Sequence, residues 1–299
     1  MSQWRTPVLP PYSMNSPAPD LLEQTDRTIA QAMANGALQP IHTERTVLRQ
    51  NGFDFSVRWV SSLALKDAAR VDAVTRKRPG FNPFLPPDPD LTVASLGPRH
   101  LAVLNKYPVI ERHLLIITRD FEAQTAPLTL ADFTALAYVM QAHGGLGFYN
   151  GGQVAGASQS HKHLQWVPAK TDLHTLAAIP SNHYDASQLP WRQLRTPLPA
   201  GCWSSADTAA AWLETSYRNA CDALDLQPVT DPMPPYNLLV TREWMTVVPR
   251  SQEKCDGISV NALGFAGSLF VREHQQIEHL RTIGPLALLQ RVATGQPSR

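Results

Sequence analysis

Residues Gly151 to Pro168 read G-G-Q-V-A-G-A-S-Q-S-H-K-H-L-Q-W-V-P, a run of small residues that passes into an alternating segment. Every second side chain of an extended strand lies on the same face. The pattern therefore places His161, His163 and Gln165 on one face of a strand, with the residues between them on the other. Glycine accepts the positive φ angles with which a loop turns its N–H groups toward an anion. Two imidazoles and a carboxamide beside such a loop indicate phosphoryl or nucleotidyl transfer through histidine.

Three other interpretations of this segment compete with that one. In the first, the histidines are half-buried strand residues satisfied by hydrogen bonds. In the second, they bind a metal, as imidazole commonly does. A zinc site needs further ligands, however, and Cys202, Cys221 and Cys255 lie singly and far downstream. In the third, Ser158 or Ser160 is a nucleophile, which would require a G-x-S-x-G turn that this stretch lacks. The nucleophilic histidine is favoured, and no metal site is predicted.

The composition predicts a chain that can bury a substantial core. It has 299 residues, with 26 Lys and Arg against 25 Asp and Glu. This near balance gives no indication of nonspecific binding to nucleic acid or membranes. Three dispersed cysteines favour reduced thiols and a cytoplasmic location. The proline-rich start lacks the apolar core of a signal peptide, and no apolar run approaches the length of a membrane span.

Periodicity along the chain predicts helices alternating with pairs of strands. A Thr129 to Asp132 capping box should start one helix, and Asn51-Gly52 should close a tight hairpin. The predicted elements are a helix over 20–35, hairpin strands over 43–48 and 53–60, a proline-rich loop over 76–90, paired strands over 100–105 and 113–118, a helix from 129 to 144, a helix from 205 to 224, hairpin strands over 236–241 and 244–249, a Gly/Ala-rich turn over 261–268, and helices near 273–280 and 285–292.

The segment His161-Lys162-His163-Leu164-Gln165 resembles the histidine-triad superfamily. Within it, the chain is most similar to the diadenosine tetraphosphate phosphorylases, also called ATP adenylyltransferases, which are related to galactose-1-phosphate uridylyltransferase. This group carries Gln where simple triad hydrolases carry a third His. The likeness covers roughly residues 40 to 272. It is carried by Asn82-Pro83-Phe84, Leu104-Asn105-Lys106-Tyr107-Pro108, the strand at His113-Leu114-Leu115, Gly156-Ala157-Ser158-Gln159 and Asn261 to Gly267.

The resemblance implies an α+β fold, a histidine-triad-like antiparallel sheet with flanking helices, built as an intramolecular pair of triad-like halves. We expect one integrated domain. Its parts are a proline-rich segment with the first helix (1–40), a catalytic half with H-x-H-x-Q (41–168), a connection with little periodicity (169–204) and a C-terminal half that completes the nucleotide site (205–299).

The resemblance also implies a role for each site residue. His163 would be the nucleophile that forms an adenylyl-histidine, His161 would support it through hydrogen bonding, and Gln165 would hold a nonbridging phosphate oxygen. The expected substrate-binding residues are Asn150, Gly156, Ala157, Ser158, Gln159, Asn261, Ala262, Leu263, Ser268, Arg272, Lys66 and Ser95. Arg272 stands where the family carries Lys, and Ser268 where a larger apolar residue is usual. Lys66 is equally compatible with a solvated surface position.

The implied reaction converts diadenosine tetraphosphate and phosphate into ATP and ADP. A neutral imidazole suits attack on an anionic phosphate ester, and nucleotidyl transfer then depends on positioning and on N–H, Lys and Arg donors. A carboxamide at Gln165 cannot shuttle a proton as imidazole can, which favours transfer to phosphate over hydrolysis. We expect no tightly bound cofactor, Mg²⁺ accompanying the nucleotide, and small nucleotides and phosphate as the partners, with no nucleic acid and no membrane.

Two alternatives share the same fold. An adenylylsulfate:phosphate adenylyltransferase would use the same adenylyl-histidine with sulfate as the leaving group. A catalytically silent nucleotide-binding module would keep the fold without the chemistry. A sugar-phosphate uridylyltransferase is less favoured, because the Asn261 to Gly267 block fits the adenine-nucleotide group better.

Overall fold

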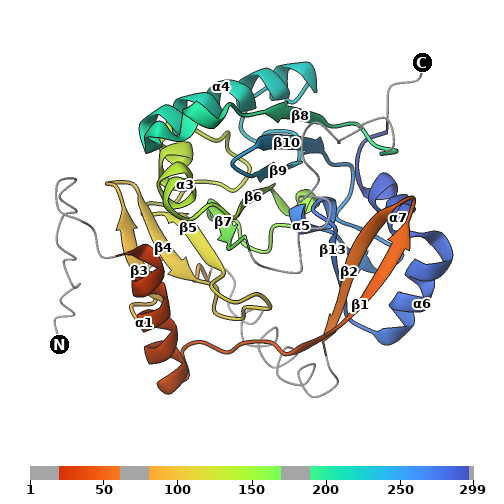
Figure 1. The fold of residues 1–299 in the computed structure, drawn as a ribbon, viewed down its shortest axis with the longest axis horizontal. Helices are drawn as coiled ribbons and strands as arrows, with labels where there is room; N and C mark the ends of the chain where they lie inside the picture. The colour runs from red at the N-terminus through yellow and green to blue at the C-terminus, as the bar shows by residue number, and fades with distance from the viewer. Residues whose placement is uncertain (1–19, 61–80, 170–188, 296–299) are drawn as a thin grey trace.

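An eight-stranded antiparallel sheet forms the centre of the computed structural model, which describes residues 20–60, 81–169 and 189–295 (Figure 1). Both predicted halves contribute strands to it, because β6 pairs with β9. In spatial order the strands are β3 (Thr92–Leu96), β4 (His100–Leu104), β5 (Leu114–Thr118), β7 (His163–Val167), β6 (Leu146–Gly151), β9 (Tyr236–Val240), β10 (Trp244–Pro249) and β8 (Leu194–Pro197).

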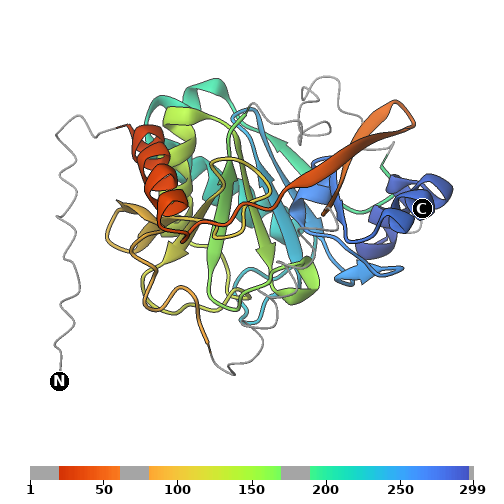
Figure 2. The same ribbon diagram turned by 90° about the horizontal axis from the view of Figure 1, so that it is seen from below.

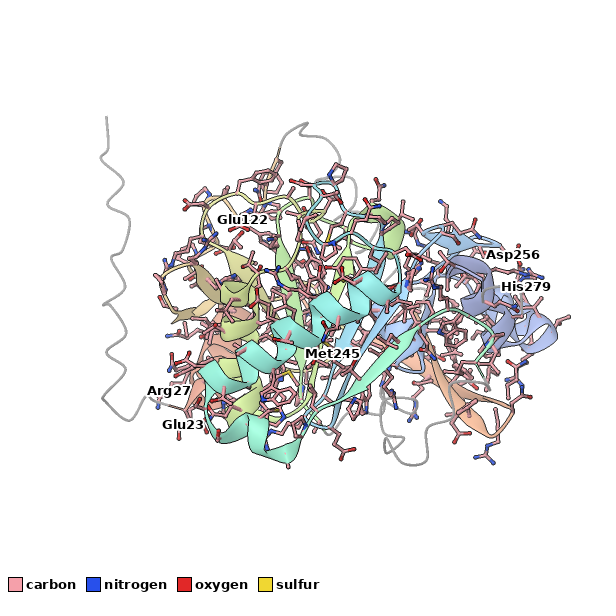
Figure 3. All side chains as sticks on the ribbon, turned by 90° about the horizontal axis from the view of Figure 1, so that it is seen from above. Glu23, Arg27, Glu122, Met245, Asp256 and His279 are labelled. Atoms are coloured by element: carbon pink, nitrogen blue, oxygen red, sulfur yellow. The ribbon has the colours of Figure 1, made fainter. Side chains whose placement is uncertain are left out.

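Three helices cover one face of this sheet: α1 (Leu21–Ala34), α3 (Leu130–His143) and α4 (Ala206–Ala223) (Figures 1 and 2). Each begins at a side chain that accepts a backbone N–H, and the Thr129 cap is the one predicted from the sequence. These are Asp20 for α1, Thr129 for α3 and Ser205 for α4. Leu164 of β7 and Met245 of β10 are fully buried in the core beneath these helices, and Figure 3 shows Met245 under α4.

The opposite face is covered over β6, β9 and β10 by the C-terminal elements and the first hairpin. The hairpin strands β1 (Thr43–Gln50) and β2 (Phe53–Val60) form a three-stranded sheet with β13 (Ser268–Val271), which runs parallel to β2. This sheet, together with the C-terminal helices, builds a second apolar core with Phe148 and Val167. The remaining elements here are β11 (Lys254–Cys255), β12 (Ile258–Ser259), α5 (Ala262–Phe265), α6 (His274–Ile283) and α7 (Pro285–Val292).

The α+β class and the antiparallel sheet predicted from the sequence are confirmed. The hairpin closes through Asn51 (φ 51°) and Gly52 (φ 80°), the two positive φ angles that an Asn-Gly turn provides. Both halves contribute strands to this one sheet. That each half is itself triad-like stays a prediction. Among the described residues, no helix is long and apolar enough to cross a membrane.

Two stretches differ from their predicted form. Part of the supposed connection over 169–204 is strand β8, which pairs with β10 at the edge of the sheet. An edge strand is only half covered, so it needs no strong apolar alternation. The predicted turn over 261–268 contains the short helix α5, which begins where the Asn261 side chain accepts the Leu263 N–H.

Candidate functional site

A cavity of about 800 Å³ lies over β5 and β7, beside the three-stranded sheet. Its size falls in the range of small-molecule sites. Its apolar lining includes Phe81, Phe84, Leu91, Val103, Ile110 and Phe270. Its polar lining includes Asn105, His113, Asn150, Ser158, Gln159, His163, Gln165 and Asn261. The cavity thus offers an apolar surface together with polar groups from both halves of the chain.

His163 is buried at the cavity wall with a fixed tautomer. Its Nδ1 lies 2.8 Å from the backbone carbonyl of His161. A carbonyl only accepts, so Nδ1 carries the proton and the Nε2 lone pair is free. Nε2 has no hydrogen-bond partner within the described residues. Burial lowers the pKa of His163 to about 4, so the ring is neutral near pH 7. A neutral imidazole with an aimed lone pair is suited to nucleophilic attack.

His161 lies behind His163 and does not line the cavity. Its Nε2 donates to the carbonyl of Thr118 at 2.9 Å, and its Nδ1 therefore accepts from the Asn82 amide at 2.9 Å. The same burial lowers the pKa of His161. Its ring thus anchors the segment whose backbone carbonyl holds the His163 proton. In this geometry His161 supports the nucleophile through the backbone.

Gln165 is oriented by a short chain of hydrogen bonds. The Asn105 Oδ1 accepts the Tyr107 N–H at 3.1 Å, which leaves its amino group to donate to His113 Nδ1, also at 3.1 Å. The His113 Nε2 proton then donates to Gln165 Oε1 at 2.9 Å. Because its oxygen is occupied, Gln165 turns its amino group toward the cavity. The geometry makes Gln165 a donor for an oxygen of the ligand.

Asn150, at the end of β6, has the same polarity. Its Oδ1 accepts the Ala262 N–H at 2.8 Å and the Asn237 amino group at 2.9 Å. The backbone N–H identifies the accepting atom as oxygen, so the Asn150 amino group faces the cavity. Ala262 acts here through its backbone. Asn150 and Gln165 therefore both present donors to the cavity, which suits an anionic ligand.

The small-residue loop after β6 forms a 3-10 turn, η1 (Gln153–Ala155). The sequence led us to expect that its backbone amides surround phosphate. The N–H groups of Gly156 and Ala157 instead bond to carbonyls inside the loop. Those of Ser158 and Gln159 have no partner within the described residues, and both residues line the cavity. Of the four loop amides predicted to bind phosphate, only those of Ser158 and Gln159 can donate to a ligand.

The second small-residue segment meets this loop directly. A Cβ placed on Gly156 would lie 2.7 Å from the Val260 carbonyl oxygen and 2.8 Å from Asn261 Cα. Asn261 and Leu263, at the start of α5, line the cavity next to this contact. Two segments that are distant in the sequence are therefore packed into one wall.

This contact makes Gly156 a sensitive position. Its φ of +93° strains any residue with a Cβ, and the added carbon would meet rigid backbone. We expect Gly156→Ala to lower kcat/KM by about 10- to 100-fold, because the strain and the displaced loop together cost on the order of 1–3 kcal/mol at the site. Gly201→Ala is the matched control, since a Cβ there meets no atom within 4 Å. Equal kinetics for the two variants would contradict this prediction.

Ala157 and Ala262, like His161, adjoin lining residues but do not line the cavity themselves. Three further predicted residues lie away from it, and Lys66 cannot be placed. Ser268 is fully buried within the β2–β13 pairing, opposite Ser56. Arg272 follows β13 with an exposed side chain. Ser95 lies on the edge strand β3, separated from β5 by β4, where it accepts from Arg119 at 2.7 Å. None of the three lines the cavity, so their roles in binding the substrate stay predictions. Lys66 lies outside the described residues.

Gln124 is a site residue that sequence reasoning missed. Strands β6 and β7 pair only as far as Phe148 and Gln165, and then diverge. The buried Gln124 side chain bridges the gap. Its Oε1 accepts the His163 N–H at 2.8 Å, and its amino group donates to the carbonyls of Asn150 (2.8 Å) and His163 (3.3 Å). It therefore fixes the backbone at the nucleophile while the strands separate.

Lys162 points away from the cavity, as the strand alternation predicted. Its Nζ, on a side chain that is 1% exposed, lies 2.8 Å from Glu122 and 3.5 Å from Asp132 of α3, and Asp132 also bonds His100 at 2.8 Å. These paired charges anchor the strand to the helical layer. In the described part of the chain, no group of three His, Cys, Asp or Glu side chains is arranged to hold a metal ion.

Two of the buried histidines, His113 and His163, predict acid sensitivity. The pKa of His113 and that of His163 are each lowered to about 4 by burial. Unfolded chains bind these protons near pH 6.5, so the contribution to stability is complete above that value and is lost as the pH falls toward 4. Each ring contributes roughly 3 kcal/mol over this window.

We therefore expect the melting temperature to fall steadily between pH 6.5 and 4.5, as followed by circular dichroism at constant ionic strength. His113→Gln keeps a donor for Gln165 and removes one of the two titrating rings, so its melting temperature should depend less steeply on pH. A melting temperature that is constant over this range would contradict the neutral, buried state of these rings.

Comparison with known families matches almost the whole chain. The family model of the Ap4A phosphorylase N-terminal domain matches residues 13–183, and that of the ATP adenylyltransferase C-terminal domain matches residues 187–295. Two curated Saccharomyces cerevisiae proteins are similar. Diadenosine 5',5'''-P1,P4-tetraphosphate phosphorylase 2 is 28% identical, over 85% of this chain and 88% of its own length. Protein APA1 is 25% identical, over 88% and 89%.

Solved structures of yeast Ap4A phosphorylase Apa2 share the fold. One structure of the yeast protein superimposes with a TM-score of 0.72 at 24% identity, and the match covers 93% of this chain and 99% of the yeast chain. The complex of the yeast protein with Ap4A gives a TM-score of 0.73 at the same identity and coverage. The architecture described above is therefore that of a known enzyme fold.

Proposed function

The chain belongs to the Ap4A phosphorylase and ATP adenylyltransferase family, and we propose that it converts diadenosine tetraphosphate and phosphate into ATP and ADP through an adenylyl-histidine. The observation that carries the proposal is the free Nε2 lone pair of His163, which faces a cavity where Gln165 and Asn150 both present amino groups. A nucleophile beside paired donors is the arrangement that nucleotidyl transfer needs.

In the first step, His163 Nε2 attacks the α-phosphorus of one adenylyl group of diadenosine tetraphosphate. The Nε2–P bond forms and the bond from phosphorus to the bridging oxygen breaks, with its electron pair leaving on ATP. The ring becomes cationic, and the His161 carbonyl, which accepts the Nδ1 proton, stabilises that charge. In the second step, an oxygen of inorganic phosphate attacks the same phosphorus, which breaks the N–P bond, releases ADP and restores the neutral ring.

Charge on the nonbridging oxygens is the main demand of both steps. The amino groups of Gln165 and Asn150 are held in place before the ligand binds, because their oxygens are already occupied. Preorganised donors of this kind lose little free energy in reorganising during the reaction. They support transfer without a proton shuttle, since a carboxamide cannot carry a proton between substrate and water.

The test is product analysis with and without inorganic phosphate. We expect equal amounts of ATP and ADP from diadenosine tetraphosphate when phosphate is present. Without phosphate, intact-mass and peptide mass spectrometry should show one added adenylyl group on His163. Release of AMP at a rate independent of phosphate would exclude the transfer reaction, and failure to form any adduct would favour a silent nucleotide-binding module. Turnover of adenylylsulfate in the same assay would separate the two adenylyl donors.

A further inference from the structure

A buried arginine lies next to the small-residue loop that follows β6, at one side of the cavity. Arg250, which directly follows β10, is 3% exposed. Its hydrogen-bond acceptors are the carbonyl groups of Val292, Gln252, Glu253 and Ala155 and the side-chain oxygen of Asn237. None of these is a carboxylate. The pKa of Arg250 is lowered to about 10 by burial, so the group remains charged at pH 7.

A buried charge without a bonded counterion is unfavourable unless a compensating charge comes near. The Glu253 carboxylate acts on Arg250 only through space, because its own hydrogen bond is to Ser259. The cavity, however, lies two hydrogen bonds away from the guanidinium. A ligand anion there would supply the missing negative charge.

Asn237 is the first link between Arg250 and the cavity. Arg250 Nη1 donates to Asn237 Oδ1 at 2.5 Å, and since a guanidinium has no acceptor, this atom must be the oxygen. The Asn237 amino group then donates to Asn150 Oδ1 at 2.9 Å and to the Ala155 carbonyl at 2.8 Å. Asn237 is fully buried on β9, so no water competes with this orientation.

Asn150 is the second link, and its amino group faces the cavity. The two carboxamide dipoles are thus aligned head to tail, with their oxygens toward Arg250 and their amino groups toward the ligand. Hydrogen bonds in such a chain polarise one another in a low-dielectric interior. The Gln124 side chain joins the Asn150 carbonyl to the backbone of His163, so this donor lies beside the nucleophile.

We propose that Arg250 and Asn237 are positioning residues of an anion site, and that they orient the Asn150 amino group toward a phosphate group bound beside His163. Through the Ala155 carbonyl, which both residues hold, they also fix the turn that precedes Gly156. The proposal rests on the proposed function for the identity of the anion, a phosphate of the nucleotide. The relay itself requires only that the cavity bind an anion.

Asn237→Asp tests this with almost no change of shape. The introduced carboxylate still accepts from Arg250, but an oxygen replaces the amino group that faces Asn150. Asn150 must then turn its own amino group away from the cavity and present its oxygen to the ligand. We expect the affinities for AMP and for inorganic pyrophosphate, measured by calorimetry, to fall by about 10- to 100-fold, the effect of one charge-assisted hydrogen bond. The affinity for adenosine should stay the same.

A second variant and two controls keep the test independent of folding. Arg250→Lys retains the charge but cannot form the fork of donors, and it should weaken AMP and pyrophosphate without weakening adenosine. Thr25→Val removes a buried hydroxyl from α1 and calibrates general destabilisation. Arg218→Met removes an exposed guanidinium that pairs with Glu214. Both controls should bind all three probes as the unmodified protein does.

The outcomes separate this proposal from the proposed function. Selective loss of AMP and pyrophosphate supports the relay. Equal loss of adenosine, or unchanged pyrophosphate binding, in both variants overturns it. If the unmodified protein turns over no adenylyl donor but still binds pyrophosphate in a way that depends on Asn237, the proposed reaction fails and the relay stands. If the unmodified protein binds no phosphate-bearing probe, both fail.

Discussion

Replacing His163 by alanine is expected to lower the turnover of diadenosine tetraphosphate by at least about 10⁴-fold, the loss typical of removing a catalytic nucleophile. Only His163 presents a free ring nitrogen to the cavity with its other nitrogen held by a carbonyl, among the residues that the structure describes. Production of ATP, followed by luciferase coupling, should fall to the background. Mass spectrometry should find no adenylyl adduct.

Two other histidine variants make this result interpretable. His279→Ala removes an exposed imidazole of α6 that pairs with Asp256 (Figure 3). Neither residue lines the cavity, so turnover should be unchanged. His161→Ala removes an anchor of the backbone and should slow adduct formation without preventing it. Full adduct formation by the His163 variant would show that another group attacks phosphorus.

Local rules predicted the strands and helices, because the signals are local. The His163 to Trp166 strand, the Asn51-Gly52 turn and the Thr129 capping box each depend on residues close in the sequence, and the structure has all three. The predicted strand was too long at its start: β7 begins at His163, and His161 does not share the cavity face with His163 and Gln165. Strand β8 was missed because an edge strand shows little of this pattern. The order of strands in the sheet depends on contacts between distant segments, which single-sequence periodicity does not encode.

The same limit explains what was found and missed at the site. The segments around Gly156 and Asn261 were recognised by composition and resemblance. Asn237 was not, although a lone Asn in an apolar strand is a signal, since a buried carboxamide must be hydrogen-bonded. Its partner Asn150 lies 87 residues away. Arg272 was carried over from the resemblance. Its side chain is exposed and does not line the cavity, so its role stays a prediction.

Gln165→Glu should be the second most damaging substitution, with a loss of about 10³-fold in kcat/KM, at the upper end of what removing one preorganised donor costs. The variant keeps the shape of the side chain and keeps an oxygen to accept from His113 Nε2. Its other oxygen takes the place of the amino group at the cavity. A donor to phosphate thereby becomes an anion that repels phosphate.

The control for this charge change is Gln39→Glu, which alters an exposed side chain outside the cavity and should leave kcat/KM within a factor of about two. The Gln165 variant should still bind adenosine as the unmodified protein does, because the apolar lining of the cavity is intact. If the variant lost adenosine and diadenosine tetraphosphate equally, Gln165 would act in packing. If it turned over at the normal rate, its amino group would not contact phosphate, and the orientation imposed by Asn105 and His113 would have no role in the chemistry.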